Sequence, residues 1–120
     1  MATRPAAPSA DLWPTLRSFV EWLDRHNGRD WHETAMRLLK VAEEAGEAAQ
    51  AYITSRGRNP RKAPTSGVHQ VTDELVDVAV TALVALHSFV ANPEEHFNAK
   101  LQEISDRVAR VEAAPESMRP

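Results

Sequence analysis

Apolar residues recur every three or four positions along most of this chain, and no stretch alternates with the period of two that a half-buried strand requires. Four segments carry this helical period. They predict helices over residues 11–26, 30–53, 68–90 and 92–112. The pattern therefore predicts an all-α fold, organised as a four-helix bundle.

Local signals support the starts of the second and fourth predicted helices. Asp30 precedes Glu33 by three residues, which is the spacing of a capping box, and Asn92 precedes Glu95 in the same way. Pro93 falls at the first helical position, where a missing backbone N–H costs nothing. We therefore expect both helices to begin with a side-chain cap.

The chain has 120 residues, enough for one domain, which we place at 11–112. Residues 1–10 and 113–120 are rich in Ala, Pro, Ser and Arg and are predicted to be flexible tails. Within the domain, residues 55–67 form a loop that contains Pro, Gly and several basic residues. The fourth helix carries an apolar seam with coiled-coil spacing, made of Phe97, Leu101, Ile104, Val108 and Val111.

The third predicted helix is apolar around an unusually wide arc. At 100° per residue its apolar positions span about 220°, whereas one packing partner needs only about 100°. Three other helices of a short chain can hardly cover such an arc. We therefore expect a homo-oligomer, and the arc does not distinguish a dimer from a tetramer.

Composition excludes several classes of protein. There is no cysteine, which excludes disulfides and thiolate metal sites and favours a cytoplasmic protein. No apolar run approaches the roughly 18 residues of a membrane span. The net charge is −3, and it is negative because of two short acidic clusters rather than an overall bias. A nucleic-acid polymer is therefore not an expected partner.

The two acidic clusters predict a metal site. They consist of Glu43, Glu44 and Glu47 on the second helix, and Asp73, Glu74 and Asp77 on the third. Residues three apart on a helix are neighbours, so two facing antiparallel helices would gather Glu44, Glu47, Glu74 and Asp77. Carboxylates without His or Cys select hard cations such as Mg²⁺ or Mn²⁺. Because Mg²⁺ prefers waters and substrate phosphates as its other ligands, the expected substrate is a di- or triphosphate.

The stretch from Lys40 to Glu47, KVAEEAGE, followed by residues 73–77, DELVD, resembles the MazG-like all-α nucleoside triphosphate pyrophosphatases. Their signature is ExxE on one helix and ExxD on the next, and the resemblance covers residues 31–107. One departure is Val76, where many relatives carry glycine.

The resemblance implies Mg²⁺-dependent hydrolysis of a nucleotide between its α- and β-phosphates. The products would be a monophosphate and pyrophosphate. Glu44, Glu47, Glu74 and Asp77 would be the metal ligands. Glu43 would be a further ligand or the group that orients the attacking water, so that Glu43 and Glu44 are the catalytic candidates.

Basic residues would neutralise the outer phosphates of the substrate. Relatives often use a Lys and an Arg on the helix after ExxD, which here suggests Lys100 and Arg107, with Asn98 beside them. Lys40 is a further substrate-binding candidate, and Trp31 would stack on the base or else cap the core. The alternative phosphate donors are Arg56, Arg58, Arg61 and Lys62 in the loop.

Three readings of the function remain open from the sequence. The first is a pyrophosphohydrolase, including enzymes that remove non-canonical nucleotides. The second is phosphoribosyl-ATP pyrophosphatase, a member of the same superfamily. The third is a non-catalytic helical interaction module that retains the metal site.

Overall fold

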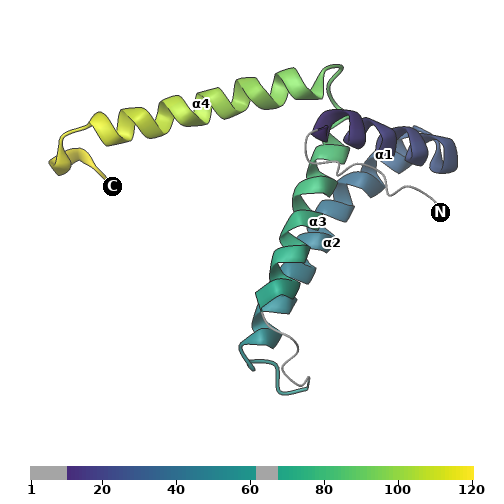
Figure 1. The fold of residues 1–120 in the computed structure, drawn as a ribbon, viewed down its shortest axis with the longest axis horizontal. Helices are drawn as coiled ribbons and strands as arrows, with labels where there is room; N and C mark the ends of the chain where they lie inside the picture. Colours follow the sequence, from purple (N-terminus) through teal and green to yellow (C-terminus); the bar gives the residue numbers. More distant parts are fainter. Residues whose placement is uncertain (1–10, 62–67) are drawn as a thin grey trace, which may run out of the picture. The chain divides into compact units, whose positions relative to one another are not determined.

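The computed structural model describes residues 11–61 and 68–120, and the chain divides into two compact units after Phe89 (Figure 1). The predicted tail 1–10 and the candidate Lys62 lie outside the described residues. The described residues are helical and contain no strand, so the predicted all-α class is confirmed.

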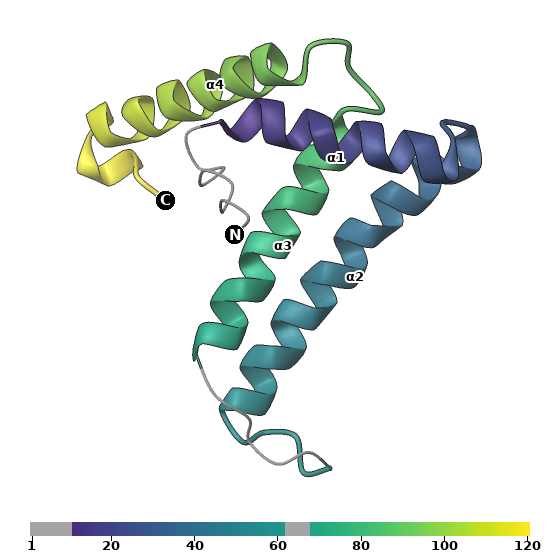
Figure 2. The same cartoon turned by 45° about the vertical axis from the view of Figure 1, so that its right-hand side comes forward.

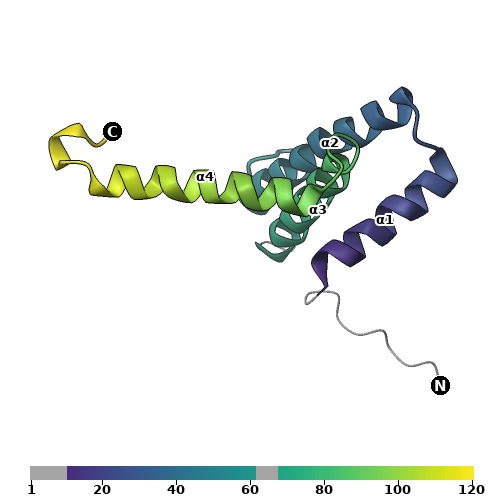
Figure 3. The same cartoon turned by 90° about the horizontal axis from the view of Figure 1, so that it is seen from above.

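The first unit contains α1 (Leu12–Asn27), α2 (Trp31–Ser55) and α3 (Val68–Leu86). The long helices α2 and α3 run antiparallel, side by side along their length (Figure 2). Helix α1 crosses the end of this pair where α2 begins and α3 ends, and seen from above it lies to one side of the pair (Figure 3). This arrangement leaves the middle of α2 facing the middle of α3.

Both predicted caps are present. The Asp30 carboxylate accepts a hydrogen bond of 2.8 Å from the backbone N–H of Glu33, at the start of α2. The Asn92 side chain accepts one of 3.3 Å from the N–H of Glu95, and its amide donates back to the Glu95 carboxylate at 3.1 Å. Each cap satisfies an N–H group that has no partner inside the helix.

Helix α3 ends at Leu86, four residues before the predicted end at Val90. The amides of residues 87–89 bond to carbonyls three residues back rather than four, which tightens the chain into a turn. A ring nitrogen of His87 lies 2.8 Å from the carbonyl oxygen of Leu83. This contact pairs a carbonyl that would otherwise lack a hydrogen-bond partner at the end of the helix. The helical spacing of apolar residues continues through this turn, so the sequence pattern predicted a helix that is too long.

The core of the first unit is small. Leu16 of α1 is the most buried large side chain, at 1% exposure. The other buried apolar residues are Ala48, Ala51, Val84 and Ala85. Small side chains at these positions let α2 and α3 approach closely, so a polar residue between them loses its water.

A buried ionic network joins α1 to α2. The Arg37 guanidinium lies 2.7 Å from the Glu33 carboxylate and 3.0 Å from the Asp24 carboxylate, and it donates a hydrogen bond of 3.3 Å to the carbonyl of Gly28. Arg37 and Glu33 are both buried. Because Arg37 binds the last turn of α1 and the first turns of α2, it sets the angle between the two helices.

The second unit consists of α4 (Pro93–Ala113) and a 3-10 turn at Glu116–Met118. The Arg119 guanidinium donates to the carbonyls of Ala114 and Glu112, at 3.1 and 2.9 Å, and holds this turn. The predicted tail 113–120 therefore contains one ordered turn. Across both units, no helix of the described chain is long and apolar enough to cross a membrane.

We predict that Arg37→Met lowers the free energy of unfolding by about 3 kcal/mol, because it leaves two carboxylates without their cation in a largely buried position. Urea unfolding at fixed protein concentration measures this change. Arg29→Met is the control, since the exposed Arg29 pairs with the same Asp24 at 3.6 Å and should contribute less than about 1 kcal/mol. Equal effects of the two substitutions would contradict the structural role of Arg37.

Candidate functional site

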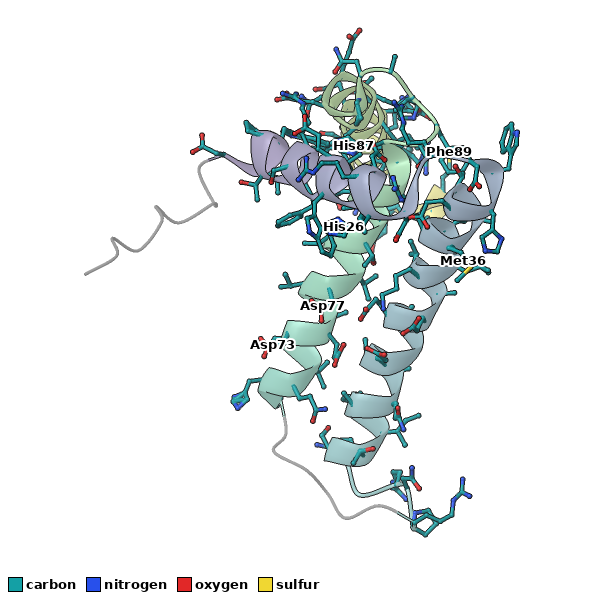
Figure 4. The ribbon with its side chains drawn as sticks, turned by 90° about the vertical axis from the view of Figure 1, so that its right-hand side faces the viewer. His26, Met36, Asp73, Asp77, His87 and Phe89 are labelled. Carbon is teal, nitrogen blue, oxygen red and sulfur yellow. The ribbon has the colours of Figure 1, made fainter. Side chains whose placement is uncertain are left out.

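Helices α2 and α3 bring three carboxylates together. One oxygen from each of Glu44, Glu74 and Asp77 lies within 4.8 Å of the other two, and we call these three residues the acidic cluster. Glu44 comes from the middle of α2, and the other two come from neighbouring turns of α3. Figure 4 shows Asp73 and Asp77 one turn apart on the stretch of α3 that runs beside α2.

The acidic cluster is partly removed from water. Glu44 is buried, at 8% exposure, and Glu74 is half-buried. One oxygen of each, Oε2 in both cases, is buried and makes no hydrogen bond within the described part of the chain. A buried carboxylate oxygen without a partner costs free energy, and a second carboxylate beside it adds repulsion. The arrangement therefore favours a bound cation.

Lys40 offsets part of the negative charge at one edge of the acidic cluster. Its Nζ lies 3.3 Å from Oε1 of Glu44 and 3.2 Å from Oε1 of Glu43. The hydrogen bonds to Glu43 and then to Glu44 raise the pKa of Lys40 above its ordinary value, so it is charged at neutral pH. Neither buried Oε2 atom is reached by this lysine.

Glu47 lies at the rim of the acidic cluster. The sequence predicted that four carboxylates would meet, and the structure gathers three of them within 4.8 Å. Glu47 is exposed, about 60° around the helix from Glu44. Its pKa is raised, first by a hydrogen bond with Glu44 and then by the charges of Glu44 and, more weakly, of Glu74. The negative field of the site therefore extends to Glu47.

A pocket of about 300 Å³ lies one helical turn from the acidic cluster. Lys40 lines it four residues before Glu44, and Thr81 lines it four residues after Asp77, with its hydroxyl donating to the Asp77 carbonyl at 2.8 Å. The apolar part of the wall is formed by Leu23, Met36 and Val84. Thr81 and these apolar residues were not predicted from the sequence as part of a site, although Met36, Lys40 and Glu44 follow the i, i+4 spacing of one helix face.

The other predicted substrate-binding residues lie at the start of α2 and in the second unit. Trp31 is the first residue of α2 and is 87% exposed, so it packs neither on the core nor beside the carboxylates. Asn98, Lys100 and Arg107 lie on α4, in the second unit. There Lys100 and Arg107 both pair with Glu103, at 3.2 and 3.6 Å.

The remaining candidates lie at the far end of α2 or on the outer face of the site. Arg56, Arg58 and Arg61 follow α2 and are exposed. Glu43 is also exposed, and its described contact is the ion pair with Lys40. Of the residues predicted to bind substrate, the first unit therefore places Lys40 beside the acidic cluster.

Comparison with known proteins adds no family assignment, because no family model, curated protein or solved structure matches this chain. The relation to MazG-like enzymes therefore stays a prediction that rests on residues 40–47 and 73–77.

We predict that Glu47→Gln stabilises the metal-free protein at pH 7. The raised pKa means that the folded state binds a proton at Glu47 more tightly than the unfolded state does. Stability is therefore lost as the pH rises from the ordinary value of 4.5 through the raised value, and Gln avoids that loss. Thermal unfolding in EDTA at several pH values should show a gain at pH 7 that shrinks toward zero below pH 4.5. Glu21→Gln, on the exposed side of α1, is the control, and a similar pH-dependent gain there would contradict the explanation.

Proposed function

We propose that this protein is a Mg²⁺-dependent nucleoside triphosphate pyrophosphohydrolase, which cleaves the bond between the α- and β-phosphates and releases a monophosphate and pyrophosphate. The observation that carries the proposal is the acidic cluster, where two helices direct three carboxylates to one place and two buried oxygens lack partners. The ExxE and ExxD spacing of these residues, typical of MazG-like enzymes, supports the same reaction.

The donor set fits Mg²⁺, or Mn²⁺ in its place. All the ligand atoms are carboxylate oxygens, which hard cations prefer, and the unpaired Oε2 atoms of Glu44 and Glu74 are free to bind. Glu44, Glu74 and Asp77 would hold the ion, and Glu47 would join them from the rim. A bound ion of this kind would polarise the phosphoryl oxygens and lower the pKa of a water molecule.

The chain's own residues would position the substrate. Lys40 stands between the acidic cluster and the pocket, where its ammonium can neutralise a phosphate. Glu43 lies on the water side of the cluster, where it can orient the attacking water. The pocket volume of about 300 Å³ suits a nucleobase, with Met36 and Val84 against its apolar faces.

We expect Glu44→Gln and Asp77→Asn each to reduce turnover by at least about 100-fold, because each removes a charged ligand from the acidic cluster. The measurement is pyrophosphate release from a panel of canonical and modified nucleoside triphosphates and from phosphoribosyl-ATP, with Mg²⁺ and with EDTA. Asp73→Asn is the matched control, since Asp73 is on the same helix but outside the acidic cluster and should leave the rate within about twofold.

Other outcomes of this assay separate the rival functions. Turnover of phosphoribosyl-ATP alone would favour the related pyrophosphatase. Metal binding without turnover of any substrate would favour a helical interaction module that retains the site. Near-normal activity of Glu44→Gln would overturn the assignment of the metal ligands.

We also propose that the protein works as a homo-oligomer. On α2, the face opposite the acidic cluster is apolar and exposed, with Leu38 at 54% exposure, and a methyl group on Gly46 would contact no atom within 4 Å. On α3, the face opposite α2 is also apolar and exposed, with Leu75 at 55%. The two exposed faces are formed by Leu38, Leu39, Ala42, Gly46, Ala49 and Ile53 on α2 and by Leu75, Val76, Ala79 and Ala82 on α3.

A second copy explains these two faces better than α4 alone does. Each face lies about 150° around its helix from the side that meets the other helix, so the two faces point in opposite directions. One helix with a single apolar seam covers at most one of them. Burial of the remaining face therefore calls for another chain.

Leu38→Arg should weaken association by at least about 100-fold, because it would place an unpaired charge in an apolar interface. Analytical ultracentrifugation over a range of concentrations measures this. Met118→Arg makes the same change at an exposed position of the 3-10 turn and should leave the mass unchanged. A monomeric wild-type protein would refute the proposal.

A further inference from the structure

Arg37 and Lys40, the two cations of α2 that pair with carboxylates, differ in their burial. Arg37 is almost fully buried, and three fixed partners surround its guanidinium. The Lys40 side chain is about half exposed, at 48%, and its ammonium touches the acidic cluster only from the edge, through Oε1 of Glu44. A lysine of this kind is a flexible point charge, whereas the arginine is a rigid structural link.

We propose that Lys40 is a tethered cation that occupies Glu44 while the divalent ion is absent and is displaced from Glu44 when that ion binds. The inference rests on the metal site of the proposed function, and it adds a positioning residue that competes with the metal. Lys40 keeps Glu44 oriented toward Glu74 and Asp77 by offsetting part of the repulsion among the three carboxylates.

The structure provides a second partner for the displaced ammonium. Oε1 of Glu43 lies 3.2 Å from Nζ of Lys40, and the Glu43 side chain is more than half exposed. When Lys40 leaves Glu44, it keeps this ion pair and stays hydrated, so the exchange leaves no charge unpaired. The same ammonium lines the neighbouring pocket, where it then faces the bound substrate.

Competition for Glu44 has a measurable consequence. If Lys40 must yield Glu44 to the metal, its presence weakens metal binding, and removal of its charge should strengthen it. The attraction between two unit charges about 4 Å apart in water, as between Lys40 and Glu44, corresponds to a factor of about five in metal affinity. A lysine that only supports the helix would affect stability but not this affinity.

The experiment is a titration with Mn²⁺ alone, followed by electron paramagnetic resonance at constant ionic strength, on the full chain. Lys40→Met should bind Mn²⁺ about fivefold more tightly than the wild type, and it should unfold at a lower temperature in EDTA. Lys40→Arg retains the charge and should stay within twofold of the wild type. Arg29→Met removes one positive charge from the exposed surface and should also leave the affinity unchanged.

Each other result overturns a stated claim. Unchanged or weaker Mn²⁺ binding by Lys40→Met, with the wild type binding normally, refutes the exchange and leaves the proposed metal site standing. Equal tightening in Lys40→Arg or Arg29→Met also refutes it, since the cause would then not be the Lys40 charge. A wild-type protein that binds no Mn²⁺ refutes the metal site itself and the exchange with it.

Discussion

The close packing of α2 against α3 is the constraint on which the site depends. Ala48 and Ala51 on α2 and Ala85 on α3 are buried in the first unit and let the helices approach. Glu44 lies on the same face of α2, so the contact that buries these alanines also removes Glu44 from water. The burial of Glu44 is thus a consequence of a tight helix pair.

The first unit buries charge in two different ways. Around Arg37, two carboxylates share its guanidinium, and the exposed Arg29 also pairs with Asp24, so two cations face two carboxylates. Around Glu44, three carboxylates face one half-exposed lysine, and two oxygens remain without a partner. Buried charges are stable only when they are paired, so the first arrangement supports the fold and the second is suited to bind a cation.

The distribution of apolar surface points to assembly beyond a single chain. The first unit has a small core, while the outer faces of α2 and α3 carry Leu and Val side chains that are about half exposed. A fold that leaves this much apolar surface open gains stability when another chain covers it. The same helix pair would then serve both functions, with the metal ligands on its inner faces and the subunit contacts on its outer faces.

The sequence by itself determined the all-α class, the side-chain caps at Asp30 and Asn92 and the acidic residues of the candidate site. These features depend on the period of a helix and on residues three or four apart, which a linear pattern contains. The sequence also predicted that Glu74 and Asp77 lie opposite Glu44, because the ExxE and ExxD motifs are on consecutive helices. The end of α3 was missed, because its last apolar residues continue the period into a turn.

Only the tertiary structure decided which charges are matched. Asp24 and Arg37 are far apart in the sequence, and their pairing needs the angle at which α1 crosses the helix pair. The exclusion of Glu47 from the centre of the acidic cluster likewise depends on how α2 is rotated against α3. The pocket between Leu23, Met36 and Val84 exists because three helices meet there. Burial and pairing are properties of surfaces in contact, and a linear pattern specifies those surfaces only after the helices have packed.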